Sequence, residues 1–474
     1  MKRGALIFGL AAAALSGCMV GPDYQRPDVE TPPAFKEAGE WKSAQPADEA
    51  SRGRWWEAFG DPQLNALVER VQISNQNVLV AEAQYRQARA LVAVSRSALF
   101  PTLSADASGT RSRSPTGAVG GTTAGRVITN RSASLDAAWE LDLWGGLRRA
   151  AEASAASAEA SAANLAAARL SAQAELVSDY FQLRMLDTQK QLLDEAAAAY
   201  QKSLDLTKNR YAAGVAGRVD VVTAETQLRS TQADAIDTRV QRAQFEHAIA
   251  VLIGKPPAQF SIDVVPLAVS MPPIPAGLPS ALLERRPDIA AAERSVAAAN
   301  ARIGVAKAAF FPSLTISGSD GFRSLSAAQL FALPNHFWSI GPALAQPLFD
   351  AGLRSAQSDQ AIAAYDATVA QYRQTVLAGF QEVEDNLAAL RILAEEAKVQ
   401  DEAVRAARES VALTLNQYKA GTVSYLNVVI VQAAQLNNER AAVSILGRHL
   451  VAAATLVKAL GGGWSAAEIT ADSR

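Results

Sequence analysis

The sequence is poor in the residues that build metal sites, disulfides and aromatic cores. It has one cysteine and three histidines among 474 residues. A single cysteine excludes an intramolecular disulfide framework, and the scattered histidines offer no zinc-type ligand cluster, so we predict no metal site. Aromatic residues make up only 6%, although hydrophobic residues make up 49%, because much of the apolar content is alanine. Such small side chains favour long, closely packed helices over a thick globular core.

The sequence also lacks an excess of charge and a catalytic motif. Its 45 Lys and Arg residues nearly balance 47 Asp and Glu residues, so the composition gives no electrostatic case for a nucleic-acid partner. Gly254-Lys255 is followed by two prolines, which excludes a P-loop. The stretch from Ser317 to Gly321 is not a nucleophile elbow, since no histidine is nearby in sequence. We therefore expect no catalytic residues and no enzymatic activity.

The N-terminus has the pattern of a secretory signal peptide at 1–17. A basic start precedes a short apolar stretch, and Leu15-Ser16-Gly17-Cys18 has the form of a bacterial lipobox. We predict that Cys18 is acylated, with palmitate among its lipids, and that no other cofactor is needed; an ordinary signal peptide with a coincidental cysteine is the alternative. Met19 favours the outer membrane in the usual sorting rule. A lipid anchor alone binds a membrane weakly, so stable attachment needs a second membrane-inserting element. No later uncharged apolar run approaches 18 residues, so we expect this element to be non-helical.

The chain contains an internal duplication of about 200 residues. Four features recur in the same order: Phe100-Pro101-Thr102-Leu103 as Phe311-Pro312-Ser313-Leu314, Leu147-Arg148 as Leu353-Arg354, Asn209–Gly214 as Asn416–Gly421, and Gly254 as Gly461. We assign an N-terminal extended segment to 18–60, repeat 1 to 61–254, repeat 2 to 288–463 and a C-terminal tail to 464–474. The intervening segment, 255–287, holds eight of the twenty prolines and is predicted to be an extended linker.

Each repeat contains two segments with the period-2 alternation of a β-strand. In 132–143, for example, Leu135, Trp139 and Leu141 alternate with polar residues. We predict strands at about 99–113, 127–143, 311–323 and 337–349, each near the length that a tilted membrane strand requires. A half-buried soluble sheet would give the same pattern over any one strand.

The number of strands favours a membrane barrel made by several chains. Four strands cannot close a barrel, and an open edge in lipid leaves backbone groups unsatisfied. Three copies would supply twelve strands, so we predict a cyclic homotrimer. The proline-free stretch from Gly146 to Arg210 would form a helix of roughly 100 Å, long enough to extend far into the periplasm.

Several motifs resemble the TolC-like outer-membrane efflux factors, specifically the lipoprotein branch containing OprM and NodT. They are Cys18-Met19-Val20-Gly21-Pro22-Asp23-Tyr24-Gln25-Arg26-Pro27, Trp55-Trp56 with Phe59-Gly60-Asp61-Pro62-Gln63-Leu64, Arg210-Tyr211 and Gly214 with Asp220, and Tyr418 and Gly421 with Leu426-Asn427-Val428. The resemblance implies a mainly α fold with membrane β-strands: a trimeric twelve-stranded barrel in the outer membrane, continuous with a coiled-coil periplasmic tunnel. It further implies a passive exit duct for drugs or other small toxic compounds. The implied partners are a periplasmic adaptor and an inner-membrane pump, usually of the RND type.

The resemblance also implies a periplasmic gate. Gly214 and Gly421 each follow a long helix, where a left-handed residue can reverse the chain into a hairpin. By resemblance, Asp220 bonds across hairpins to Tyr418; the alternative is that Asp220 merely caps the helix beginning near Val221.

An apolar constriction is a second implied part of this gate. Leu426 matches the position where the lipoprotein branch places the constriction, and a ring of leucines could dewet a channel. Asn427 and Ile430 stand where some relatives carry aspartates, which favours a hydrophobic gate over an acidic ring.

Other functions remain open from the sequence. An outer-membrane factor for type I protein secretion is the nearest alternative, and a structural coiled-coil lipoprotein or a periplasmic adaptor comes from a different class. An adaptor would need lipoyl-like modules between its helices, where this chain has amphipathic strands. Heavy-metal export is less favoured, because four methionines and three histidines provide no obvious shuttle sites.

Overall fold

A computed structural model describes residues 19–38, 54–113, 127–268 and 285–462. The predicted signal peptide, the predicted lipidation residue Cys18 and the tail at 464–474 lie outside the described residues. The chain divides into two compact units, each assembled from segments distant in sequence. The sheet unit takes described residues from Met1–Asp28, Tyr85–Ser161 and Ala292–Tyr372; the hairpin unit takes them from Val29–Gln84, Ala162–Ala291 and Arg373–Arg474.

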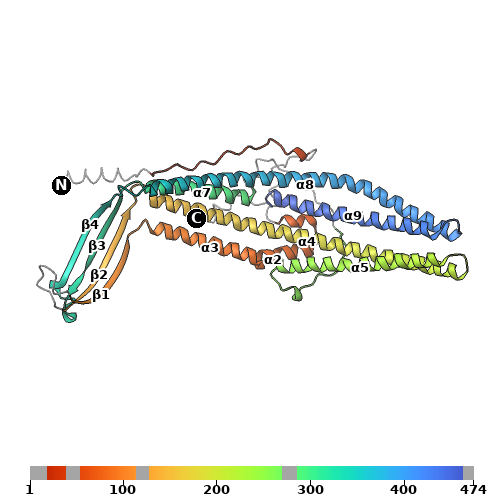
Figure 1. The fold of residues 1–474 in the computed structure, drawn as a ribbon, viewed down its shortest axis with the longest axis horizontal. Helices are drawn as coiled ribbons and strands as arrows, with labels where there is room; N and C mark the ends of the chain where they lie inside the picture. The colour runs from red at the N-terminus through yellow and green to blue at the C-terminus, as the bar shows by residue number, and fades with distance from the viewer. Residues whose placement is uncertain (1–18, 39–53, 114–126, 269–284, 463–474) are drawn as a thin grey trace. The chain divides into compact units, whose positions relative to one another are not determined.

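The two halves of the chain have the same order of elements (Figure 1). Each runs helix, strand, strand, long helix, shorter helix: α3 (Gln76–Ser97), β1 (Thr102–Arg113), β2 (Val127–Leu141), α4 (Gly146–Ala212) and α5 (Arg218–Leu252), then α7 (Pro287–Ala308), β3 (Ser313–Ser324), β4 (His336–Ala345), α8 (Leu353–Ala420) and α9 (Tyr425–Ala459). Matched helices have 22 and 22, 67 and 68, and 35 and 35 residues. These near-equal lengths agree with a duplicated unit.

The four strands form one antiparallel sheet in the order β1-β2-β3-β4. Leu103 pairs with Ala137, Ala137 with Gly318, and Gly318 with Ile340. All four strands join helices at one end of the sheet, and the described connection 325–335 joins β3 to β4 at the other end. Within the described chain, β1 and β4 each pair on one side only, so the sheet has two open edges.

The strands are shorter than the segments predicted from alternation alone. The Phe100 amide donates to the Ser97 carbonyl, and the Phe311 amide donates to the Ala308 carbonyl. Both Phe-Pro pairs therefore belong to the turns that end α3 and α7. The Asp142 carboxylate accepts the Leu147 amide at 3.0 Å, which ends β2 early and begins α4. Turn and cap chemistry therefore overrides the hydrophobic pattern at these boundaries.

Alternation places apolar and polar side chains on opposite faces of the sheet. One face, named here the apolar face, carries large apolar side chains from every strand, most of them exposed: Leu103, Leu135, Trp139, Ile316, Trp338, Ile340 and Leu344. The other face carries serines and Asp106 and Asp136, which share hydrogen bonds with Ser104 and Ser134. A sheet of this kind separates an apolar surrounding from a polar one.

Alanine and glycine allow close helix packing in the sheet unit. Ala156 of α4 packs against Ala297 and Ala298 of α7, with Tyr24 alongside. A Cβ atom on Gly304 would lie 2.8 Å from the Arg149 side chain, so a larger residue would disturb this contact. The alanine-rich helix therefore packs closely, as its composition predicts.

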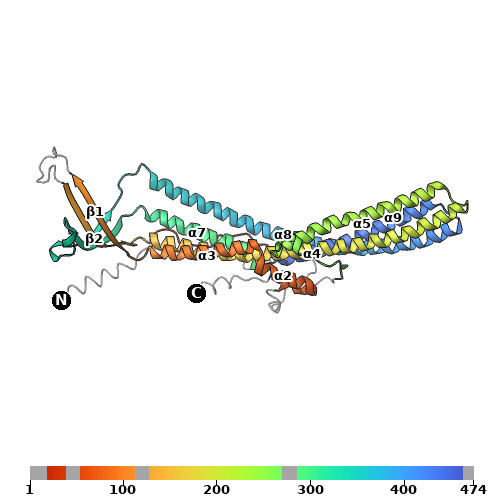
Figure 2. The same cartoon turned by 90° about the horizontal axis from the view of Figure 1, so that it is seen from below.

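The hairpin unit packs α5 and α9 beside the C-terminal parts of α4 and α8, as both views show (Figures 1 and 2). Its core is a row of aromatic and aliphatic side chains, which includes Leu193, Tyr200, Leu204, Leu228, Tyr418, Tyr425, Val428 and Leu436. A short 3-10 helix (Trp55–Phe59) and α2 (Pro62–Ser74) bury both tryptophans of the Trp55-Trp56 motif.

The predicted proline-rich linker is mostly non-helical where it is described. Pro257–Gln259 forms a single 3-10 turn, residues 260–268 run without regular structure, and 269–284 lie outside the described residues. Among the helices that the structure describes, one, α9, is apolar and long enough to span a membrane by length and composition alone. Its Gln432 and Glu439 nevertheless bond to Ser203 of α4 and Arg408 of α8, so α9 is held by helix contacts.

Candidate functional site: hairpin tips and membrane-facing sheet

The turns at the two hairpin tips have the same backbone geometry. Gly214 and Gly421 have φ angles of 74° and 80°, in the left-handed region that glycine adopts without strain. The amides that follow reach back five residues: Val215 donates to the Arg210 carbonyl at 2.9 Å and Thr422 to the Gln417 carbonyl at 3.0 Å. This is a Schellman-type ending, and both predicted turn glycines stand at its left-handed residue.

Tyr418 joins the two hairpins within one chain. Its side chain is 3% exposed, and its hydroxyl lies 3.2 Å from the Thr207 hydroxyl on α4. The Arg210 guanidinium lies over the Tyr418 ring, 4.7 Å from its centre. The Tyr425 ring packs edge-on against the same ring at 5.4 Å.

Arg210 also binds the C-terminal end of α8. Its Nη1 donates to the carbonyl oxygens of Tyr418 at 2.9 Å and Lys419 at 3.2 Å. A cation at a helix C-terminus is favourable because the last carbonyls carry partial negative charge. Sequence reasoning missed Arg210 as a contact residue; the one available signal was that Gln417 replaces it in the second copy.

Asp220 does not bond Tyr418 within the described chain. Its Oδ2 accepts the Gly217 amide at 3.1 Å, which caps the start of α5. Within the single chain, the carboxylate turns back to its own helix end and the Tyr418 hydroxyl faces Thr207, so the Asp220–Tyr418 bond implied by resemblance stays a prediction. The helix-cap alternative describes the observed contact.

The predicted constriction residues share one exposed face of α9. Leu426, Asn427 and Ile430 point away from the core residues Tyr425 and Val428. Leu426 and Ile430 are 58% and 57% exposed, which leaves two large apolar side chains uncovered within one chain.

Burial raises the pKa of Tyr425 to about 12, with smaller contributions from Tyr418, Tyr200 and Asp220. Tyr425 is therefore a neutral core residue beneath the constriction face. Charge at this end of the hairpin unit comes from side chains such as Arg210 and Asp220.

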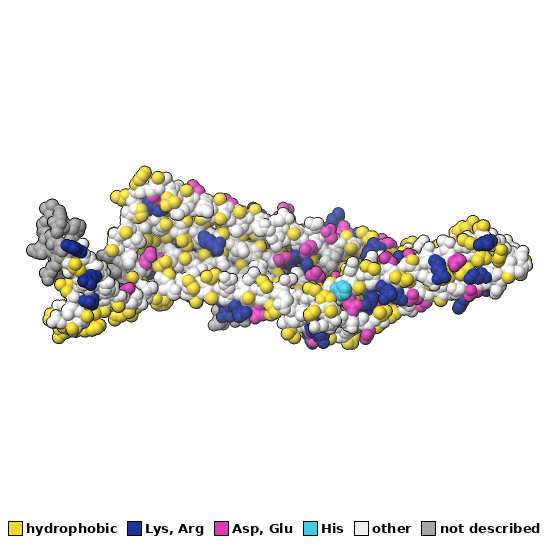
Figure 3. Space-filling model, turned by 60° about the horizontal axis from the view of Figure 1, so that its bottom comes forward, with side chains coloured by type: hydrophobic (Ala, Val, Ile, Leu, Met, Phe, Trp, Pro, Cys, Tyr) yellow, Lys and Arg dark blue, Asp and Glu magenta, His cyan; other side chains and the backbone are white. Residues whose placement is uncertain are grey.

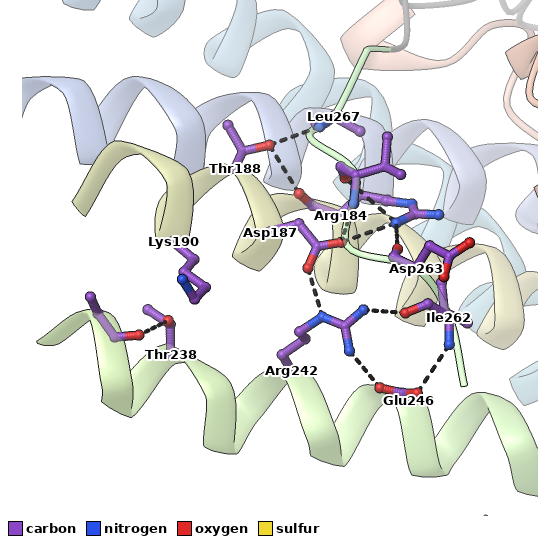
Figure 4. Close-up of polar contacts among 12 residues, drawn as sticks. Arg184, Asp187, Thr188, Lys190, Thr238, Arg242, Glu246, Ile262, Asp263 and Leu267 are labelled. Carbon is purple, nitrogen blue, oxygen red and sulfur yellow. Dashed lines mark hydrogen bonds and ion pairs between the residues drawn. The ribbon is translucent and has the colours of Figure 1, made fainter. Parts of the chain in front are cut away.

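A buried ionic network holds the base of the first hairpin (Figure 4). Asp187 is 1% exposed and accepts from Arg184 on α4 at 3.0 Å and from Arg242 on α5 at 2.7 Å. Arg242 also pairs with Glu246 at 2.5 Å and donates to the Ile262 carbonyl. The network ties both helices of the hairpin to the chain segment that follows it.

The described part of the second copy lacks this network. His449 stands where Arg242 stands in the first copy, 207 residues on, and burial lowers its pKa.

Within the described residues, no group of three or more His, Cys, Asp or Glu side chains could hold a metal ion.

The model of the family described as "Outer membrane efflux protein" matches residues 67–255 and 278–462, once for each copy. The chain belongs to this family. The toluene efflux pump outer membrane protein TtgC of Pseudomonas putida is 31% identical over 467 residues, which cover 98% of this chain and 96% of TtgC. The cation efflux system protein CusC of Escherichia coli is 28% identical and covers 96% of this chain and 97% of CusC.

Solved structures match the efflux protein over nearly its whole length. The outer-membrane channel OprN superimposes with a TM-score of 0.88 at 32% identity, covering 94% of this chain and all of OprN. The open state of the Neisseria gonorrhoeae MtrE outer membrane channel superimposes with a TM-score of 0.83 at 32% identity, covering 94% of this chain and 98% of MtrE. The predicted fold class, outer-membrane location and efflux role are thereby confirmed.

The apolar face of the sheet is the side suited to contact with lipid in an outer-membrane protein. Aromatic residues lie toward both ends of the sheet: Trp144 stacks on Phe311 at 4.7 Å at the helix end, and Phe322 and Trp338 lie near the loop end. Aromatic side chains at two levels are typical of the two membrane interfaces. The 67 residues of α4 correspond to about 100 Å of helix, far more than a bilayer needs, so the helix end of the sheet faces the periplasm.

Proposed function

We propose that three copies of this chain form a passive exit duct for small toxic compounds, with a twelve-stranded barrel in the outer membrane and a helical tunnel in the periplasm. The observation that carries the proposal is the open four-stranded sheet with one apolar face. Unpaired strand edges cannot remain in lipid, and pairing β4 of one copy with β1 of the next in a ring removes every edge.

The duct supplies no catalysis and takes its energy from partners. We assign these partners to a periplasmic adaptor and an inner-membrane pump, of the RND type by resemblance. Relatives are named for the efflux of toluene, solvents and cations and for pyoverdine export, all small solutes. Small-molecule efflux is therefore favoured over protein secretion. A structural coiled-coil role would leave the amphipathic sheet without a purpose.

The hairpin tips form the gate of this duct. Thr207 and Arg210 hold the tip of one hairpin to Tyr418 of the other, and Leu426, Asn427 and Ile430 face the lumen in the assembled ring. A ring of leucine and isoleucine narrows the passage and disfavours water and ions. In this proposal, Asp220 stabilises the start of α5 and does not itself close the gate.

A covalent lipid on Cys18 completes the membrane attachment in this proposal. Acyl chains and barrel together provide the two signals that stable anchoring needs. Intact-mass measurement of the mature protein and of Cys18→Ser tests this: the wild type should carry the added mass of a lipidated N-terminus, and the variant should lack it.

Planar-bilayer recording of the purified protein tests the duct itself. A closed tip predicts low conductance for the wild type, and Leu426→Ala should raise it by widening the constriction. Val219→Ala, an exposed apolar residue of the other tip, serves as a matched control for loss of apolar surface. A monomeric, water-soluble protein without channel activity would contradict the proposal.

Cross-linking and susceptibility profiling test the partners. Cross-linking in cells should recover an adaptor and a pump, and a deletion strain should gain sensitivity to small toxic compounds. Loss of a secreted protein without a change in susceptibility would instead support the protein-secretion alternative.

A further inference from the structure

Three arginines lie on the apolar, membrane-facing side of the sheet. Arg111 and Arg113 follow Leu103 at even intervals along β1, so all three share one face. Arg131 of β2 pairs with Gly109 and lies on that same face. A charge facing lipid is strongly destabilising at the bilayer midplane and much less so near the interface. These arginines are therefore expected to lie at the membrane interface, where anionic lipid headgroups are within reach.

Their position along the strands puts them at the outer leaflet. They lie at the loop end of β1 and β2, opposite the end where the strands join the helices. Since the helix end faces the periplasm, the loop end faces the cell exterior. Figure 3 shows Lys and Arg side chains gathered at this end of the sheet, next to hydrophobic side chains. The charges therefore stand at headgroup level, above an apolar band.

The spacing of the arginines suits a phosphorylated headgroup. Arg111 pairs with Thr129, which is two residues from Arg131. The two arginines are therefore diagonal neighbours on adjacent strands, with backbone positions about 7–8 Å apart. The Nη1 of Arg131 donates to the Leu325 carbonyl at 3.0 Å, which holds this side chain toward the β3–β4 connection. A guanidinium can present two parallel donors to one phosphate, which makes it well suited to this anion.

The nearest acidic group on this face is already engaged. Asp320 of β3 lies within 3.3 Å of the His336 ring through both carboxylate oxygens. Below the arginines, Leu135, Phe322 and Trp338 continue the apolar face. The surface thus combines a cationic rim with an apolar strip long enough for acyl chains.

We propose that this face binds a phosphorylated glycolipid of the outer leaflet, with the phosphates on Arg111 and Arg131 and the acyl chains on the apolar strip. The proposal depends on the outer-membrane orientation, but not on the gate or on the pump partners. It explains why guanidinium groups stand on a face that is otherwise apolar.

The test measures binding of bisphosphorylated lipid A to the full-length protein in phosphatidylcholine nanodiscs. Arg111→Gln with Arg131→Gln should weaken binding by about 100-fold, roughly tenfold for each lost charged contact. Arg323→Gln is the matched control, because Arg323 lies at the same level on the opposite face, over the Phe337 ring. Its binding should equal that of the wild type.

Two further arms identify the ligand. Dephosphorylated lipid A should bind the wild type as weakly as lipid A binds the double variant, and millimolar inorganic phosphate should not displace lipid A. Equal binding by the double variant, equal binding of the dephosphorylated lipid, or full displacement by free phosphate would each overturn the proposal. Single-channel conductance of the double variant should match the wild type, which separates this result from a failure of the proposed duct.

Discussion

The Arg210 guanidinium of the first hairpin donates at 2.9 Å to the backbone carbonyl of Tyr418, near the end of the long helix of the second hairpin. It also covers the Tyr418 ring, so one side chain makes a charged hydrogen bond and a cation–π contact across the two hairpins. This relationship makes Arg210 the residue whose loss should most directly separate the tips.

Replacing Arg210 should open the gate. In Arg210→Gln the charged contacts to α8 are lost, and we expect the open probability in planar bilayers to rise about tenfold. Arg218→Gln, a change to an exposed arginine at the same tip, is the control and should leave conductance unchanged. Unchanged conductance in Arg210→Gln would remove this residue from the gate.

Replacing the turn glycines should lower stability through backbone strain alone. A Cβ on Gly214 would meet nothing within 4 Å, and on Gly421 only the Arg210 guanidinium at 3.7 Å. Alanine at either position should therefore cost about 1–2 kcal/mol, the penalty of a left-handed conformation. Thermal unfolding of Gly214→Ala and Gly214→Asn measures this loss of stability. The asparagine variant should lose less, because asparagine tolerates the left-handed conformation better. Equal losses for both variants would point to a cause other than strain.

Breaking the buried ionic network should strongly destabilise the first hairpin. Asp187→Asn leaves Arg184 and Arg242 without their shared carboxylate, and we expect a loss of about 3–5 kcal/mol in the free energy of unfolding. The exposed pair Lys190 and Asp194 provides the control, since Asp194→Asn should change stability by less than about 1 kcal/mol. Denaturant unfolding distinguishes the two outcomes.

Stability should depend on pH through Asp179 of α4. Burial, and then the charge of Glu175, raise the pKa of Asp179 to about 6. The folded state therefore favours the protonated carboxyl, so the stability present at pH 4 is lost as pH rises through 6. Asp179→Asn should stabilise the protein at pH 7.5 by roughly 1–2 kcal/mol, allowing for partial solvent screening, and by almost nothing at pH 4. Thermal melts at both pH values check this, and a constant difference would contradict it.

The fold was predictable where the sequence repeats a local pattern. Alternating side chains indicate the four strands, and the motif pairs indicate the duplication, because both signals depend only on neighbouring residues or a constant offset. The strand ends were less predictable, since Asp142 ends β2 through a hydrogen bond to the next helix.

Contacts between helices were not predictable in the same way. Arg210 meets Tyr418, and Arg242 meets Asp187, only because distant turns of different helices face one another. No spacing rule in the sequence encodes that alignment. Resemblance pointed to Tyr418 and assigned its contact to Asp220, whereas within the described chain Asp220 accepts the Gly217 amide and Arg210 donates to the Tyr418 carbonyl.

The duplication described above has a consequence for symmetry. Three chains that each carry the unit twice would surround the lumen with six similar hairpins, yet only alternate hairpins would contribute an Arg210 and an Arg242, because Gln417 and His449 occupy these places in the other copy. The ring would therefore have a pseudo-sixfold outline, but the contacts made by Arg210 and Arg242 would occur only three times around it. Its aperture would dilate as a three-lobed opening instead of a uniform circle.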